Sequence, residues 1–246
     1  MASALQYPSA GCIDSHVHLT NVGSFPYSWM SGAQAHQGAF DSPVEVKPWT
    51  EQGLKAAAEA ASVPLAGCVH IENTDGENMD GFVGEARWVL SLMRGDGDYG
   101  PGGPGASPSI IRGTVAHIPC SEGPEAVQTF ADRMTSEESC SDGTLPAGLK
   151  GGREVLNGAA PDACLAPAFV DAVRKVGELG LHWEICVSPA GFPNTPALVK
   201  QCPGTTFVVD HMGYCGKDFD SWLATVRELS AFGNVFMKLG AVEEWE

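Results

Sequence analysis

Two histidines separated by a single residue, His16 and His18, are the first side chains in the sequence that could do chemistry. They belong to segment 11–19, which reads as a short β-strand, and alternate side chains of a strand point to the same face. Two imidazoles on one face can bind one divalent cation or polarise one substrate oxygen. The alternative is a chance pairing in a half-buried strand.

A third histidine, His211, ends the apolar segment 205–211. Strand alternation predicts that it shares a face with Phe207 and Val209, whereas Asp210 faces the helices and makes a structural hydrogen bond. The C-terminal ends of parallel strands meet at one rim, so we expect the three histidines to converge there. Such a convergence is more specific than any one histidine.

The elements that must position these residues alternate between strand-like and helix-like patterns. The expected strands are 11–19, 63–71, 109–118, 147–156, 181–187, 205–211 and 234–239, and the expected helices are 50–61, 84–93, 124–134, 167–179, 195–201 and 219–232. This alternation predicts an α/β protein with a parallel sheet, and we expect a TIM-type (β/α)₈ barrel. An open doubly wound sheet is the alternative, but no glycine-rich phosphate motif follows the first strand.

The barrel expected from this pattern lacks one unit. Nothing after Leu239 can supply an eighth strand, and unpaired backbone at the two sheet edges would be unfavourable. We therefore expect a chain truncated before the eighth strand, or a partner that fills the gap.

Composition narrows the classes of protein and partner. Of the 246 residues, 43% are hydrophobic and 18% charged, which is enough for a sizeable core. The formal net charge of -16 disfavours nucleic acid and anionic membrane surfaces as partners. We find no signal peptide at the N-terminus and no apolar run of membrane-spanning length. A small-molecule substrate is the expected partner, and a homo-oligomer stays open.

The eight cysteines point to a reducing compartment. None lies in a Cys-x-x-Cys pair, and Cys12, Cys68 and Cys186 lie within apolar segments. Buried reduced thiols explain this pattern better than a disulfide framework does. The sequence therefore predicts a soluble protein of the cytoplasm.

Two motifs together resemble a known superfamily. Segments 13–18 (IDSHVH) and 207–213 (FVVDHMG) look like the amidohydrolase superfamily, and more narrowly the amidohydrolase-related (amidohydrolase 2) group with sugar lactonases and 2-pyrone-4,6-dicarboxylate lactonase. The intervening segments that fit the same pattern are 85–88, 148–153 and 179–187. The resemblance implies one barrel domain over 1–246, incomplete at its C-terminus, that hydrolyses a lactone or a related ester-like carbonyl.

The resemblance also implies roles for individual residues. His16 and His18 would bind one divalent metal, zinc foremost, or would polarise the substrate in metal-free members, and His211 would stabilise the carbonyl under attack. Family members end the eighth strand in an aspartate that acts as general base, which this sequence lacks. The remaining candidate bases are Glu184 and Asp210, and alternation turns Glu184 inward.

Other polar residues at strand ends are less specific. Arg153 and Lys238 could hold a substrate carboxylate or hydroxyls, with surface salt bridging as the alternative. We interpret His70 and His117 as satisfied, non-catalytic histidines. Cys186 reads as a buried thiol rather than a nucleophile, because no histidine partner is readable around it.

The sequence thus predicts a lactonase-type hydrolase with catalytic residues His16, His18, His211 and Glu184. Two alternatives stay open. One is a metal-dependent decarboxylase of the same superfamily, although such enzymes typically have a histidine on strand five where this chain offers Glu184. The other is a catalytically inactive fragment or binding subunit.

Overall fold

The computed structural model describes residues 11–27, 47–73, 78–99, 105, 108–136 and 143–240. The chain divides into two compact units, residues 1–116 with 147–149 and residues 117–146 with 150–246. Each unit is described separately below, and the single domain expected from the sequence stays a prediction. Among the described helices, none has the length and apolar character that crossing a membrane requires.

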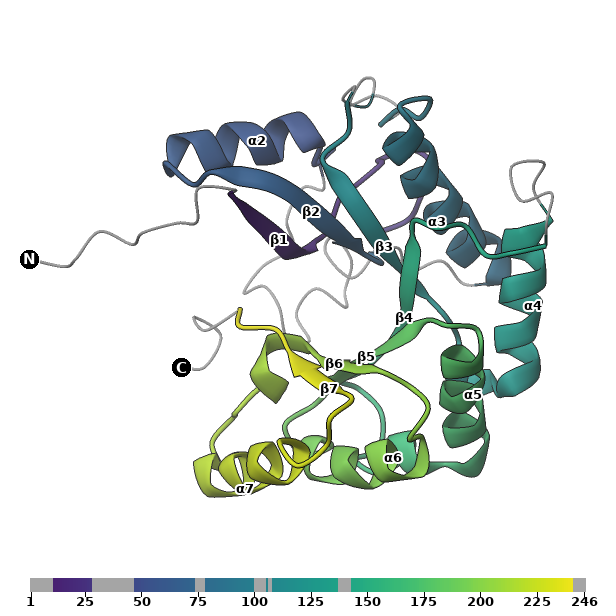
Figure 1. Ribbon diagram of the computed structural model, residues 1–246, viewed down its shortest axis with the longest axis vertical. Helices are drawn as coiled ribbons and strands as arrows, with labels where there is room; N and C mark the ends of the chain where they lie inside the picture. Colours follow the sequence, from purple (N-terminus) through teal and green to yellow (C-terminus); the bar gives the residue numbers. More distant parts are fainter. Residues whose placement is uncertain are drawn as a thin grey trace, which may run out of the picture. The chain divides into compact units, whose positions relative to one another are not determined.

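The described residues of the first unit form three parallel strands and two α-helices. In chain order they are β1 (Cys12–Val17), α2 (Glu51–Ala60), β2 (Leu65–Ile71), α3 (Met79–Arg94) and β3 (Ile111–His117). Each strand pairs with the next in parallel, in the order β1-β2-β3 (Figure 1). The β-α-β alternation read from the sequence is confirmed here.

Helix α3 shows why the first unit folds as it does. The Asn78 side chain caps its start by accepting hydrogen bonds from two backbone amides. Gly95 ends the helix in the left-handed conformation, at φ 83°. Between these ends, Val89 and Leu92 point into a core that also contains Leu19 of the segment after β1. The end of β1 is therefore anchored on one side by buried apolar packing.

In the second unit, the described part of the chain forms four parallel strands and four α-helices. They are α4 (Pro124–Thr135), β4 (Leu149–Leu156), α5 (Pro167–Glu178), β5 (His182–Val187), α6 (Thr195–Gln201), β6 (Phe207–Val209), α7 (Phe219–Leu229) and β7 (Val235–Met237). The strands are again ordered as in the chain, β4-β5-β6-β7, and all neighbours are parallel. Proline stands in the first turn of α4, α5 and α6, where its missing N–H has no helical partner to lose.

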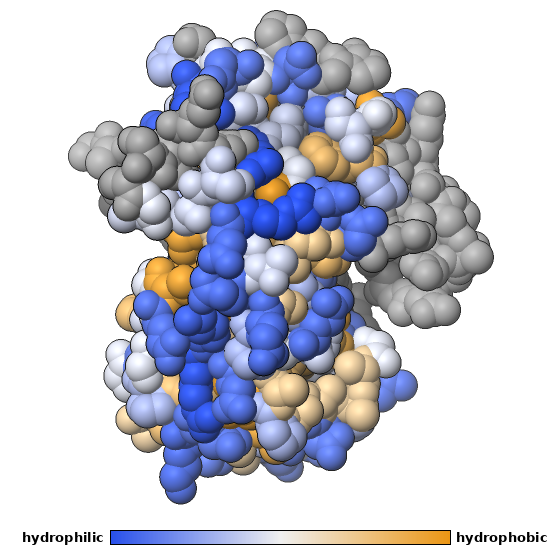
Figure 2. Space-filling model, turned by 90° about the vertical axis from the view of Figure 1, so that its right-hand side faces the viewer, coloured by the Kyte–Doolittle hydropathy of each residue, from blue (hydrophilic) through white to orange (hydrophobic). Residues whose placement is uncertain are grey.

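The strands of the second unit have one apolar and one polar face. Trp183, Ile185, Phe207 and Val209 are at most 3% exposed, and helices α5, α6 and α7 lie along one side of this sheet (Figure 1). Helix α5 packs Phe169 against Trp183, with ring centroids 5.7 Å apart. The outer face of the helices is mostly hydrophilic on the side where α4 and α5 lie (Figure 2). The opposite sheet face is free to carry polar residues.

The sequence predicted the elements well and their ends less well. All seven expected strands are present, and within the described residues no further strand follows β7. Strand β6 is only three residues long rather than seven, because the chain turns at Asp210. The described cysteines are free thiols and all but Cys12 are buried, as expected, while Cys140 lies outside the described residues.

Candidate active site

The histidine pair lies at the end of β1, as the sequence predicts. His16 is the penultimate residue of the strand and His18 follows it. Their rings meet edge to face with centroids 4.9 Å apart, and their Nε2 atoms are 3.2 Å apart. The backbone carbonyl of Ile71, at the end of β2, lies 3.1 Å from Nδ1 of His18. Both rings are half-buried, which leaves them accessible to a small ligand.

The Ile71 contact fixes how His18 can react. A carbonyl oxygen only accepts, so Nδ1 of His18 carries its proton and Nε2 keeps its lone pair in the neutral ring. Metal-binding histidines are commonly oriented in this way through their second nitrogen. Zinc–nitrogen bonds of about 2.0–2.1 Å to both Nε2 atoms would subtend roughly 100° at the observed spacing, near the tetrahedral angle. The pair therefore fits one zinc ion, and the same spacing lets the two rings share a proton.

His70, on β2, lies in a different environment from this pair. It is 1% exposed, its Nδ1 lies 3.1 Å from the Thr114 hydroxyl, and its ring meets the edge of Trp88 at 6.1 Å. These contacts belong to the packed core of the first unit. They agree with the interpretation of His70 as non-catalytic.

Four charged side chains form a buried network in the second unit. Arg153 Nη1 donates to Asp210 Oδ2 at 3.0 Å. Lys238 Nζ lies 3.1 Å from Asp210 Oδ1 and 2.6 Å from Glu184 Oε1. No side chain of the four is more than 10% exposed, and two positive and two negative charges balance. The fold thus brings together Arg153, Glu184 and Lys238, three of the residues singled out in the sequence.

The two carboxylate oxygens of Glu184 have different surroundings. Its Oε1 also lies 3.3 Å from Nε2 of His182, whose ring occupies space that a side chain at Gly151 would fill. Its Oε2 is buried and has no hydrogen-bond partner among the described residues. A buried carboxylate oxygen in this state is unfavourable unless another group completes it. A bound water or substrate hydroxyl would do so.

The direction predicted for Asp210 is wrong. The parallel register pairs Glu184 with Val208 and Ile185 with Val209, so Val208 and Asp210 share the face of Glu184. The sequence could have revealed this if the register between β5 and β6 had been known. Asp210 therefore joins the charged network, where it binds both cations, instead of facing the helices.

His211 is not on a strand but in the turn Asp210–Gly213 that ends β6. Its φ is 49°, and Met212 and Tyr214 also have positive φ values, of 54° and 46°. Left-handed backbone costs about 1–3 kcal/mol at a non-glycine residue and often marks functional sites. Because strand alternation does not extend into this turn, it cannot give the direction of His211. The convergence of His211 with His16 and His18 stays a prediction.

The fold and these residues define an α/β protein with parallel strands in chain order and polar groups at the strand ends. Comparison with known proteins refines this class. Residues 145–246 match the model of the amidohydrolase family. The match covers the segment with the motif at 207–213, and similarity to the amidohydrolase family therefore extends over this part of the chain. No curated protein is significantly similar to the chain.

Solved structures confirm the barrel-type fold. Amidohydrolase 2 from Bifidobacterium longum subsp. infantis has a TM-score of 0.63 at 21% identity, over 93% of this chain and 72% of the other. A zinc-bound amidohydrolase from Burkholderia multivorans has a TM-score of 0.66 at 18% identity, over 94% and 70%. A probable 2-pyrone-4,6-dicarboxylic acid hydrolase from Acinetobacter baumannii, with citric acid bound, has a TM-score of 0.60 at 13% identity, over 96% and 72%. At these identities the comparison establishes the fold.

Proposed function

We propose that the protein hydrolyses a small polar lactone, carboxylated or derived from a sugar, through attack by an activated water. The match of residues 145–246 to the amidohydrolase family supports the hydrolase class. One structural neighbour is named for a 2-pyrone dicarboxylate, which is a carboxylated cyclic ester. This neighbour supports the choice of a lactone as the substrate class.

The buried carboxylate of Glu184 carries the proposal. Lys238 and His182 hold Oε1, while Oε2 is buried without a hydrogen-bond partner among the described residues. A fixed carboxylate with an open acceptor suits a general base, because it can take a proton from a water placed beside it. We therefore assign Glu184 as the base of the reaction.

The histidines take the complementary roles. We assign His16 and His18 to polarise the scissile carbonyl and His211 to stabilise the oxyanion that forms on it. Water adds its oxygen to the carbonyl carbon and gives one proton to Glu184. The bond from this carbon to the ring oxygen then breaks, and the ring oxygen takes the proton back from Glu184. The product is a hydroxy acid, which ionises and releases one proton near neutral pH.

A divalent metal fits the histidine pair, as the 3.2 Å spacing of the two Nε2 atoms indicates. When bound there, zinc would act as a Lewis acid toward the carbonyl oxygen. His16 and His18 would hold it, and the Ile71 carbonyl would keep His18 in the required tautomer.

We also propose that Arg153 and Lys238 bind the substrate. Both already pair with buried carboxylates, Arg153 with Asp210 and Lys238 with Asp210 and Glu184. A substrate carboxylate would therefore compete with these internal anions, or share a cation with them. The free thiols, Cys68 among them, support our further proposal of a reducing, cytoplasmic location.

A panel of lactones, followed by proton release in a weakly buffered indicator solution, tests the proposed function. We expect the wild-type protein to release one proton per lactone opened. Glu184→Gln and His211→Ala should each slow this about a hundredfold or more, with an unchanged circular dichroism spectrum.

The outcomes separate the alternatives. Full activity in both variants would exclude the assigned site. Binding of a lactone without any proton release by the wild-type protein would favour a binding subunit over an enzyme. Loss of activity on chelation, restored by zinc, would assign the metal-dependent form of the mechanism.

A further inference from the structure

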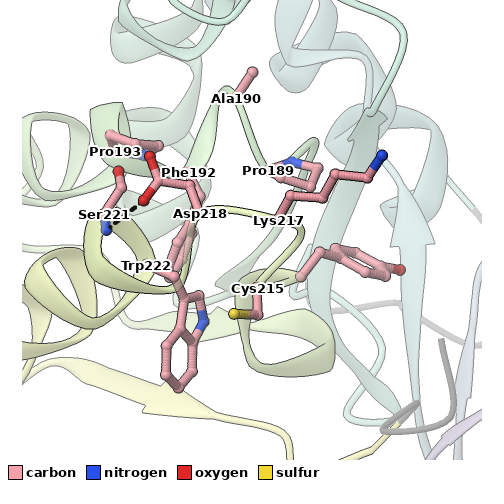
Figure 3. A pocket seen from close by; sticks show the side chains of 10 residues that line it. Pro189, Ala190, Phe192, Pro193, Cys215, Lys217, Asp218, Ser221 and Trp222 are labelled. Atoms are coloured by element: carbon pink, nitrogen blue, oxygen red, sulfur yellow. Dashed lines mark hydrogen bonds between the residues drawn. The ribbon is translucent and has the colours of Figure 1, made fainter. Parts of the chain in front are cut away.

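The loops that follow β5 and β6 line an open cavity of about 380 Å³ within the second unit (Figure 3). Small-molecule sites typically begin at about this volume. The cavity is lined by Pro189, Ala190, Phe192, Pro193, Tyr214, Cys215, Lys217, Asp218, Ser221 and Trp222. No step of the proposed hydrolysis uses these residues.

Two glycines allow the two walls of the cavity to pack closely against each other. Gly213, at φ 76°, packs directly on the ring of Phe192, so any side chain there would collide with it. Gly216, at φ 59°, lies so close to Pro189 that a Cβ would be 2.9 Å from the proline ring. Each contact joins the loop after β6 to the loop after β5. The cavity is therefore formed before any ligand binds, which lowers the entropic cost of binding.

The cavity is connected to His211 in two ways. The ring of Tyr214, which lines the cavity, lies 5.1 Å from the His211 ring. The indole Nε1 of Trp222, also in the lining, donates to the carbonyl oxygen of Met212 at 2.7 Å. A group bound in the cavity would therefore touch residues that hold the turn carrying His211.

The lining indicates the chemistry of the ligand. Pro189, Pro193 and Trp222 line the cavity with apolar surfaces that can accept a ring. Lys217 is the only lysine or arginine among the ten lining residues. Figure 3 shows its side chain extending away from Asp218, whose Oδ1 instead accepts the backbone N–H of Ser221 at 3.0 Å. In a chain of net charge -16, such a local cation favours an anion at this position.

We propose that this cavity binds the carboxylated ring portion of the substrate, with Lys217 as the residue that selects for the carboxylate. The inference rests on the proposed lactone hydrolysis, to which it adds the place where the substrate is recognised. The ring lies against Pro193 and Trp222, and the carboxylate faces the ammonium group of Lys217. The adjoining Tyr214 places the bound group beside His211.

Binding of 2-furoate tests the site without any hydrolysis, because this flat ring acid has no bond for the enzyme to cleave. Its affinity is compared with that of furfuryl alcohol, the uncharged analogue, by isothermal titration calorimetry. Replacing the exposed lysine by Lys217→Gln should weaken furoate binding about fivefold and leave alcohol binding unchanged. Ala190→Trp, at an exposed lining position, should abolish binding of both probes. Lys200→Gln, at an exposed lysine of α6 outside the cavity, should change neither.

Equal furoate affinity in the wild-type protein and Lys217→Gln would overturn the assignment of Lys217. Undiminished binding in Ala190→Trp would overturn the cavity as the site. These results do not depend on activity. If no lactone is hydrolysed but furoate binding depends on Lys217, the proposed function fails while the binding site stands. If lactones are hydrolysed with the same preference in wild type and Lys217→Gln, the function stands and the selective role fails.

Discussion

The histidine pair of the first unit and the charged network of the second unit are assembled at different distances along the chain. His16 and His18 are two positions apart, and one strand end places both rings. The network instead joins side chains contributed by β4, β5 and the ends of β6 and β7, from Arg153 to Lys238. A local motif can be read from a sequence, whereas a network of this kind depends on the register of every strand that contributes to it.

The two regions also differ in what they do for stability. The half-buried histidines make one polar contact with each other, and water can solvate the remaining ring when the other is removed. Each network member is almost completely buried, so removing one leaves an opposite charge without compensation. We therefore expect changes at the histidine pair to affect chemistry first and loss of the shared cation Lys238 to affect folding first.

The largest effect is expected from Lys238→Met. This change leaves the buried carboxylates of Glu184 and Asp210 without their shared cation, and should lower the free energy of unfolding by about 3–5 kcal/mol. Urea denaturation measures it. The matched control is Lys175→Met, which removes the exposed Lys175–Glu178 pair and should cost about 0–1 kcal/mol.

A second variant makes this result interpretable. Adding Glu184→Gln to Lys238→Met removes the uncompensated charge, because Asp210 keeps its pair with Arg153, and should restore part of the lost stability. Equal, small losses in Lys238→Met and Lys175→Met would show that the network is not the stabilising element that its burial indicates.

The next effect concerns metal binding at the histidine pair. His16→Ala removes one of two nitrogen ligands and should weaken zinc binding at least about a hundredfold. Removing only a hydrogen-bond partner of a metal ligand already lowers metal affinity about 10–100-fold. A zinc titration against a chromogenic chelator measures this affinity. The free energy of unfolding of the metal-free protein should change by less than about 1 kcal/mol. Equal zinc affinity in the wild-type protein and His16→Ala would indicate that the two rings share a proton and do not bind zinc.

The contrast between the regions explains what the sequence could predict. It predicted the order of strands and helices, because apolar periodicity acts locally. It also predicted that Glu184 faces inward, which requires alternation within one strand. It placed Asp210 on the wrong face, because that placement depends on the pairing of β6 with β5 and on where β6 ends.

The turn that carries His211 could not be predicted either. Methionine and tyrosine rarely adopt the left-handed conformation, and most histidines do not adopt it either, so the residue types alone do not predict the positive φ values at positions 211, 212 and 214. These angles are held by contacts from other segments, including the hydrogen bond from Trp222 to the Met212 carbonyl. Tertiary contacts of this type are outside the reach of local patterns.

A smaller effect separates His70 from the histidine pair. Thr114→Val removes the hydroxyl that lies 3.1 Å from His70 Nδ1 in the core, and should lower the free energy of unfolding by about 1–2 kcal/mol. Zinc affinity and lactone hydrolysis should be unchanged, which a chelator titration and the proton-release assay would check. A loss of activity larger than the loss of folded protein would indicate that His70 takes part in the reaction.

The smallest effect is a pH dependence in the core beneath the histidine pair. Burial, followed by the nearby charges of Glu51 and Asp14, raises the pKa of the Cys68 thiol from 9.0 to about 12. The thiol therefore ionises in the unfolded chain at a lower pH than in the folded protein, so its contribution to stability is complete below about pH 9 and is lost as the pH rises toward 12. Cys68→Ala should make the fall in unfolding free energy between about pH 9 and pH 11 shallower, while its curve between about pH 6 and pH 8 runs parallel to that of the wild-type protein. Curves that stay parallel throughout would show that Cys68 is solvated in the folded protein, and would remove the packed core as the support of this end of β1.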